Sequence, residues 1–146
     1  MNANPFSLAG KRVLVTGASS GIGRAAAIEC ARAGAELLIT GRDEERLLAT
    51  LQALDGGPHR AVAADLTDPE GIERLVDEAR GLDGVVHSAG IACSRPFPFV
   101  CRKVLDGVME INFYAPAELT RRLLRASAVG RGASLVFVSS VAGLGC

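Results

Sequence analysis

Short apolar runs alternate with amphipathic segments along the 146-residue chain. The runs at 13–15 and 37–39 contain only valine, leucine and isoleucine between polar residues, which is typical of buried strands. Elsewhere apolar residues recur near helical spacing, and glycine or proline ends three of these segments. The pattern predicts strands at 13–15, 37–39, 61–63, 84–87 and 134–138. It predicts helices at 24–33, from the Asp43 cap to 56–58, from the Asp68 cap to Gly81, and at 102–126.

The order of these elements sets the expected architecture. Strands that alternate with helices favour parallel pairing through right-handed crossovers, and therefore an α/β fold with a doubly wound parallel sheet. We expect the strand order 3-2-1-4-5. No repeat or low-complexity linker divides the sequence, so residues 1–146 are predicted to form a single domain.

Composition narrows the functional classes. The 16 basic residues balance 16 acidic ones, so neither a nucleic-acid partner nor a polybasic membrane contact is favoured. No apolar run reaches the roughly 18 residues that a membrane helix needs. The four cysteines form no Cys-x-x-Cys pair, so no metal site is expected. The absence of a signal-peptide pattern in 1–12 predicts a cytoplasmic location.

A glycine-rich segment, Thr16-Gly17-Ala18-Ser19-Ser20-Gly21-Ile22-Gly23, joins the first strand to the first helix. Glycines allow positive φ and let the backbone approach a ligand closely. A helix that starts behind them presents unpaired N–H groups and a positive dipole end, which suit a pyrophosphate. Because a predicted strand precedes this motif and a predicted helix follows it, the motif indicates a dinucleotide-binding site. A structural turn without a ligand is the alternative.

Further motifs follow in a fixed order along the chain. Asp65-Leu66 follows the third strand, His87-Ser88-Ala89-Gly90 ends the fourth, Asn112 lies in the long helix, and Ser139-Ser140-Val141-Ala142-Gly143 follows the fifth. Together with the glycine segment, this set resembles the short-chain dehydrogenase/reductase family, which are nicotinamide-dependent oxidoreductases with a Rossmann-type fold. The resemblance implies catalytic roles for Ser140 and Asn112. It implies cofactor contacts at Gly17, Ser19, Ser20, Gly21, Ile22, Gly23, Arg42, Asp65, Leu66, Ser88, Ala89 and Gly90.

Three of these positions have a second explanation or depart from the family pattern. Asp65 could start a turn before Thr67, which is compatible with a contact to adenine. Ser88 replaces a family asparagine, and its shorter hydroxyl can make only part of the same hydrogen bonds. His87 is expected to pack at the end of its strand, because no carboxylate neighbours it in the sequence.

Arg42 bears on the choice of cofactor. An acidic residue after the second strand would bind the ribose hydroxyls of NAD, whereas an arginine can pair with the 2′-phosphate of NADP. A guanidinium matches phosphate oxygens as a bidentate fork, so Arg42 favours NADP over NAD. The alternative is a solvated arginine that pairs with Asp43 or Glu45.

Asn112 and Pro116 lie four residues apart in the long predicted helix. Proline has no N–H to bond the carbonyl of residue 112, so the helix should be interrupted and bend near Pro116. The freed carbonyl of Asn112 would accept a bond from water. In the family this asparagine holds a water of the proton relay. A simple packing kink is the alternative.

The acid–base pair of the family is missing from this sequence. In the family, a Tyr-x-x-x-Lys segment follows the serine, at a place beyond Cys146. The only tyrosine here is Tyr114, and the only lysines are Lys11 and Lys103. No Tyr-x-x-x-Lys can be drawn from them. The 146-residue chain alone is therefore predicted to be inactive as a reductase.

Two hypotheses follow. In the first, the chain is a fragment, truncated after the fifth strand, of an NADP(H)-dependent oxidoreductase. Its complete form would transfer hydride between the nicotinamide and a small carbonyl or alcohol substrate, and would be a homo-oligomer. In the second, it is a non-catalytic dinucleotide-binding remnant or pseudoenzyme. Both predict that the fifth strand is an exposed sheet edge and that the 102–126 helix carries an exposed apolar patch.

Overall fold

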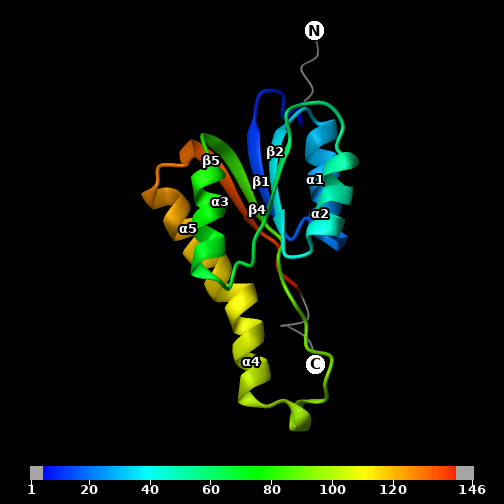
Figure 1. The fold of residues 1–146 in the computed structure, drawn as a ribbon, viewed down its shortest axis with the longest axis vertical. Coiled ribbons are helices and arrows are strands. Elements are labelled where there is room, and N and C mark those ends of the chain that lie inside the picture. The colour runs from blue at the N-terminus through cyan, green and yellow to red at the C-terminus, as the bar shows by residue number, and fades with distance from the viewer. Residues whose placement is uncertain (1–4, 141–146) are drawn as a thin grey trace.

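Five parallel strands and the helices between them make up residues 5–140, the part of the chain that the computed structural model describes (Figure 1). The strand order is β3-β2-β1-β4-β5, as predicted, and every neighbouring pair is parallel. The strands are β1 (Arg12–Thr16), β2 (Glu36–Gly41), β3 (Arg60–Ala63), β4 (Leu82–His87) and β5 (Val129–Phe137). The helices are α1 (Gly21–Arg32), α2 (Glu44–Gln52), α3 (Pro69–Glu78), α4 (Arg102–Met109) and α5 (Ala115–Arg125).

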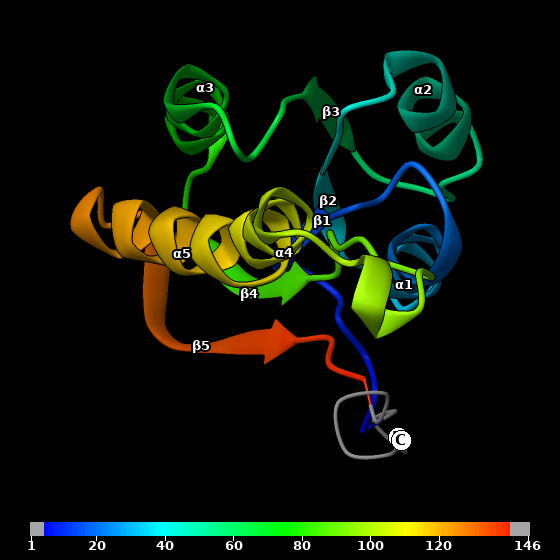
Figure 2. The same ribbon diagram turned by 90° about the horizontal axis from the view of Figure 1, so that it is seen from below.

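Helices cover the sheet from two sides. Figure 2 shows α1 and α2 on one face of the sheet and α3 and α5 on the other. Side chains alternate along β1, so that Val13 and Val15 pack under α1 and α2 while Leu14 joins the cluster beneath α3 and α5. These two apolar layers explain why the sequence runs of the central strands are continuously hydrophobic.

The predicted caps are confirmed. The side chain of Asp43 accepts a hydrogen bond from the Arg46 N–H at 3.0 Å, and α2 begins after it. Asp68 does the same for the Glu70 N–H at 3.1 Å, with Pro69 at the first position of α3. Both aspartates therefore set where a helix starts and how it leaves the sheet.

Several predicted boundaries were wrong. Helix α2 ends at Gln52, before the predicted stop at 56–58, and β4 begins at Leu82 rather than at 84. Helix α1 begins at Gly21 rather than at residue 24, so its first turn lies inside the glycine segment. Strand β5 begins at Val129 rather than at 134, because its pairing with β4 is irregular between Leu82 and Gly84. Gly132 has φ +80° within this irregular stretch, a conformation that favours glycine.

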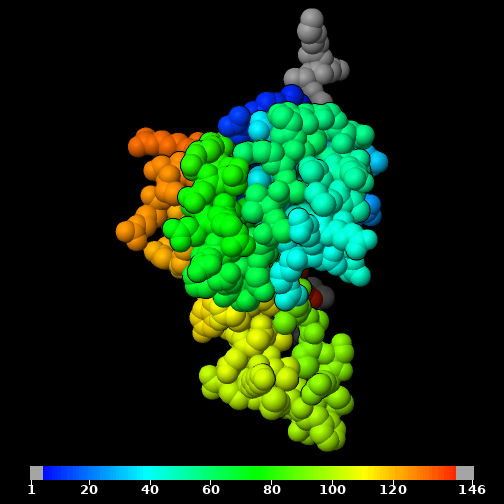
Figure 3. Space-filling model, in the orientation of Figure 1, coloured from blue at the N-terminus to red at the C-terminus, as the bar shows by residue number. Residues whose placement is uncertain are grey.

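The long helical segment is interrupted just before Pro116, as predicted, by a change in its winding. A π-helical turn, η2 (Glu110–Tyr114), joins α4 to α5, and Pro116 lies at the start of α5. Proline cannot donate to the carbonyl four residues earlier, and the wider π turn accommodates the missing bond. Figure 3 shows α4 and the segment before it projecting from the body of the domain.

The expected exposed edge is present. Strand β5 ends the sheet, and along it the side chains of Leu135, Val136 and Phe137 are exposed. Phe113 and Leu124 in the long helical segment are exposed as well. An edge strand with apolar side chains is a surface on which another polypeptide can pair or pack.

Candidate functional site

A cleft of about 870 Å³ lies at the carboxyl ends of the strands. All strands are parallel, so the loops that follow β1, β2, β3 and β4 meet at this edge of the sheet. The cleft brings together the glycine segment and every other predicted cofactor-binding residue except Asp65. Its lining consists of Gly17, Ser19, Ser20, Gly21, Ile22, Gly23, Gly41, Arg42, Asp43, Arg46, Ala64, Leu66, Ser88, Ala89, Gly90, Ile91 and Ile111.

The glycines of the segment that follows β1 have different structural roles. Gly17 has φ +66°, and a Cβ there would lie 2.7 Å from the Ala89 nitrogen. A Cβ on Gly23 would collide with the carbonyl oxygen of Gly17. Gly21 has φ +54°, and a Cβ there would meet no protein atom within 4 Å. Gly17 and Gly23 therefore allow close packing of loop and helix, whereas Gly21 borders open space in the cleft.

The start of α1 is suited to an anion. Ser20 is the N-cap residue, and its side chain makes no capping hydrogen bond. The first turn of α1 contains no acidic residue. Backbone N–H groups at the start of a helix have no partner inside the helix, and the dipole adds partial positive charge there. This end of the cleft can therefore receive a phosphate group.

Threonine hydroxyls hold the loops of the cleft in place. The Oγ1 of Thr16 accepts hydrogen bonds from the N–H groups of Ser88 and Ala89, each at 3.1 Å. The hydroxyl of Thr50 donates to the carbonyl of Ala18 at 2.9 Å. Both threonines are buried, so these bonds are shielded from water. These hydrogen bonds hold the cleft loops against the core without a bound ligand.

Charged side chains line the cleft beyond the end of β2. Arg42 is exposed there, and among the described residues it forms an ion pair with neither Asp43 nor Glu45. Asp43 instead faces Arg46, with 3.3 Å between Oδ2 and Nε. Gly41 contributes no side chain, and a Cβ on it would lie 2.9 Å from the Ser19 hydroxyl. Residue 41 therefore places no side chain in the cleft, and a carboxylate beyond β2 is supplied by Asp43.

Asp65 makes the turn that the sequence suggested. Its Oδ1 accepts hydrogen bonds from the backbone N–H and the hydroxyl of Thr67, at 2.9 and 2.7 Å. These bonds, the backbone one first, hold the pKa of Asp65 below its usual value, and the charge of Arg42 lowers it further. Asp65 precedes the cleft-lining residue Leu66, and its contact with adenine stays a prediction.

Asn112 connects the π-helical turn to the loop after β4. Its Nδ2 donates to the carbonyl of Ile91 at 2.9 Å, and its Oδ1 accepts from the Ile91 N–H at 2.8 Å. The adjacent Ile111 is buried and lines the cleft. The side chain of Asn112 therefore positions a wall of the cleft, and its part in a proton relay stays a prediction.

Ser140 lies just beyond β5 and is exposed, but it is not among the residues that line the cleft. The strand before it is tied to β4, since the Val138 N–H donates to the carbonyl of His87 at 2.9 Å. The next residues of the predicted motif, 141–143, lie outside the described part of the chain. The catalytic role of Ser140 thus stays a prediction.

His87 packs at the end of β4, as expected. Its ring is 4% exposed and stacks on Phe137 with centroids 4.6 Å apart. Its Nε2 lies 2.9 Å from the hydroxyl of Thr120 in α5. Burial lowers the pKa of His87 to about 4, so the ring is neutral at physiological pH. A neutral, enclosed ring here joins β4, β5 and α5.

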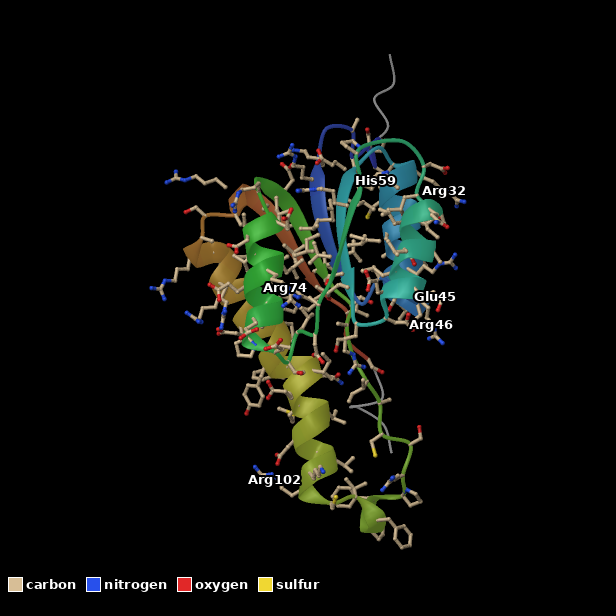
Figure 4. The ribbon with its side chains drawn as sticks, in the orientation of Figure 1. Arg32, Glu45, Arg46, His59, Arg74 and Arg102 are labelled. Atoms are coloured by element: carbon tan, nitrogen blue, oxygen red, sulfur yellow. The ribbon has the colours of Figure 1, made fainter. Side chains whose placement is uncertain are left out.

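Sequence reasoning missed several residues of the cleft. Two of them could have been found from the sequence. Ile111 adjoins the predicted site residue Asn112, and Arg46 lies three residues after the cap residue Asp43. Figure 4 shows Arg46 in the first turn of α2, at the end of the domain opposite Arg32. Ala64 and Ile91 follow strand ends and carry no recognisable signal. The cleft-lining residues that were not predicted to bind the cofactor are Gly41, Asp43, Arg46, Ala64, Ile91 and Ile111.

Within residues 5–140, no cluster of three or more histidine, cysteine or acidic side chains could hold a metal ion. None of the helices in the same range is long and apolar enough to cross a membrane.

The known proteins that this chain resembles include dehydrogenases and reductases. The family model described as short chain dehydrogenase matches residues 11–145. L-rhamnose 1-dehydrogenase (NAD(P)(+)) of Azotobacter vinelandii is 40% identical over 92% of this chain and 57% of its own length. A dehydrogenase/reductase from Sinorhizobium meliloti has a TM-score of 0.82 and 38% identity, over 89% of this chain and 54% of that one.

A third similar protein was solved with ligands. L-sorbose reductase from Gluconobacter frateurii, in complex with NADPH and L-sorbose, has a TM-score of 0.78 and 28% identity. The match covers 84% of this chain and 49% of that one, so the chain spans about half the length of these relatives. The cleft, the sheet order and these matches agree: the chain belongs to the short-chain dehydrogenase/reductase family of oxidoreductases.

Proposed function

We propose that the cleft binds NADP(H), and that the complete protein transfers hydride between this cofactor and a carbonyl or alcohol substrate. The nicotinamide supplies the hydride chemistry when it is bound. This chain's residues bind and orient the cofactor: the start of α1 receives the pyrophosphate, and Ser88, Ala89 and Gly90 line the wall beside it.

One observation carries the choice of NADP(H) over NAD(H). Arg42 lines the cleft after β2 with its guanidinium unpaired by Asp43 or Glu45, and Gly41 offers no carboxylate beside it. A 2′-phosphate needs such a cation, whereas bare ribose hydroxyls favour an acid. One relative that was solved with NADPH supports this choice, and another that is named for NAD(P)+ is compatible with either cofactor.

A second candidate function is dinucleotide binding without turnover by the chain as it stands. Tyr114 is exposed, and its ring packs edge-on against that of Phe113, with 5.4 Å between the ring centroids. Lys11 binds Asp83 at 3.1 Å near the amino ends of β1 and β4, opposite the cleft. Neither residue is arranged to exchange a proton with a substrate, since a general acid must reach the reacting atom within hydrogen-bond distance. We propose that the complete protein supplies that group from another segment.

The cofactor assignment can be tested by calorimetric titration of the 146-residue chain with NADP+ and NAD+. Arg42→Ala should weaken NADP+ binding about tenfold or more, since a hydrogen bond to a charged group contributes about 1.5–3 kcal/mol. NAD+ binding should change little. Arg32→Ala is the matched control, because it removes the same charge from an exposed ion pair on α1. Equal losses for the two dinucleotides would remove the NADP(H) assignment.

Turnover separates the two candidate functions. The 146-residue chain should consume no NADPH with a carbonyl substrate, and robust consumption would show that the chain holds its own proton donor. A longer natural form that does turn over would support the hydride-transfer proposal for the complete protein.

A further inference from the structure

Arg46 and Asp43 form a charged pair at the wall of the cleft. Asp43 uses Oδ1 to cap α2 through the Arg46 N–H, at 3.0 Å, and its Oδ2 faces Nε of the same arginine at 3.3 Å. One aspartate thus fixes both the backbone and the guanidinium of Arg46. Both side chains line the cleft beside Arg42.

The pair leaves part of the guanidinium available. The contact with Asp43 involves Nε, and among the described residues neither terminal nitrogen of Arg46 has a hydrogen bond to a protein acceptor. The Arg46 side chain is 70% exposed and lines the cleft, so these donors are accessible to a ligand there. Terminal guanidinium nitrogens are the groups that bind phosphate oxygens.

The negative charge of Asp43 would oppose a phosphate in the cleft unless Arg46 balances it. An unmasked carboxylate next to the cofactor ribose would repel a 2′-phosphate and would favour the free hydroxyls of NAD(H). Like charges at close range oppose each other even in partly exposed sites. Arg46 neutralises this carboxylate at the place where Arg42 attracts the phosphate.

We infer that Arg46 is a second specificity-determining residue, which binds the 2′-phosphate of NADP(H) and masks the Asp43 carboxylate that would otherwise favour NAD(H). This inference rests on the proposed function and deepens it. Arg42 attracts the phosphate directly, whereas Arg46 both contacts it and cancels the opposing charge.

The test is calorimetric titration of the 146-residue chain with NADP+ and with NAD+. Arg46→Ala should weaken NADP+ binding about tenfold, and should leave NAD+ binding unchanged or slightly stronger, since a charged hydrogen bond is lost and a carboxylate is unmasked. Arg46→Lys keeps a charge beside Asp43 and should retain most of the NADP+ affinity. Arg32→Ala is the control for removal of an exposed arginine.

A double substitution isolates the masking role. Asp43→Asn removes the charge but keeps a good helix cap, so α2 should start at the same residue. In this background Arg46→Ala should weaken NADP+ binding clearly less than it does alone, because only the contact with the phosphate is lost and no carboxylate is unmasked. Equal losses in the two backgrounds would overturn the masking role.

Failure of the inference can be told apart from failure of the proposed function. If the wild-type chain prefers NADP+ and Arg46→Ala behaves like Arg32→Ala, the inference is wrong and the proposed function stands. If the wild-type chain binds neither dinucleotide, both are wrong. Circular dichroism of each variant verifies that the fold is kept, and the exposed position of Arg46 makes unfolding by its substitution unexpected.

Discussion

Mild acid should destabilise this chain through the neutral ring of His87. The pKa of His87 is about 4 in the folded chain because the ring is buried, compared with 6.5 for a solvated histidine. Above pH 6.5 the ring is neutral in both the folded and the unfolded chain, so the contribution of His87 to the free energy of unfolding is fully present. Between pH 6.5 and 4 only the unfolded chain binds the proton, so the free energy of unfolding falls as the pH falls.

The size of the effect follows from the two pKa values. A difference of about 2.5 between them corresponds to a loss of about 3 kcal/mol by pH 4, at about 1.4 kcal/mol for each pH unit. Among the described residues no charged side chain contributes to the lowered pKa, so burial alone is responsible. A loss of this size is a large part of the stability of an ordinary domain.

Urea unfolding at half-unit steps from pH 7.5 to 4 measures the effect. His87→Gln keeps a polar group facing Thr120 but cannot take up a proton in this range. The difference between wild-type and variant unfolding free energies should change by about 3 kcal/mol over the window, while contributions from carboxylates cancel. Parallel curves for the two proteins would refute the reasoning, as would an NMR titration of His87 with a midpoint near 6.5.

Three further predictions concern the loops of the cleft. Gly21→Ala and Gly56→Ala both place a Cβ in open space at positive φ, so each should cost about 1 kcal/mol in unfolding free energy, but only Gly21→Ala should weaken NADP+ binding measurably. Asn112→Ala removes both hydrogen bonds to Ile91 and should lower the unfolding free energy by about 1–2 kcal/mol in urea. Thr16→Val keeps the side-chain shape but leaves two amides without their acceptor, so a loss of about 1–3 kcal/mol is expected, and an unchanged midpoint would contradict it.

The fold could be predicted because its signals are local. The apolar runs of the central strands, the caps at Asp43 and Asp68, and the alternation of elements are all readable without tertiary contacts. The start of β5 could not be predicted, because residues 129–133 pair irregularly with β4 and their backbone path depends on that partner. The start of α1 was missed because Gly21 and Gly23 are poor helix formers whose place is set by packing.

The residues of the site could be predicted where they belong to a recognisable sequence motif, and could not be predicted elsewhere. The glycine segment and Arg42 could be read directly, and the structure gathers them around one cleft. The cleft contributions of Arg46 and Ile91 depend on which way a helix turn and a loop face, which spacing alone does not reveal. The hydroxyl of Thr16 was also hidden, since its two partners are more than seventy residues away.

The contact between Gly41 and Ser19 has an evolutionary consequence. A Cβ at residue 41 would lie 2.9 Å from the Ser19 hydroxyl and 3.2 Å from its Cβ, so the two positions share one space. Substitutions at residues in contact do not add independently. An acidic side chain at 41 is therefore accommodated only if the Ser19 hydroxyl rotates away and residue 19 shifts slightly. Substitutions at the end of β2 and in the glycine segment are thus coupled, so each changes which side chains the other position accepts.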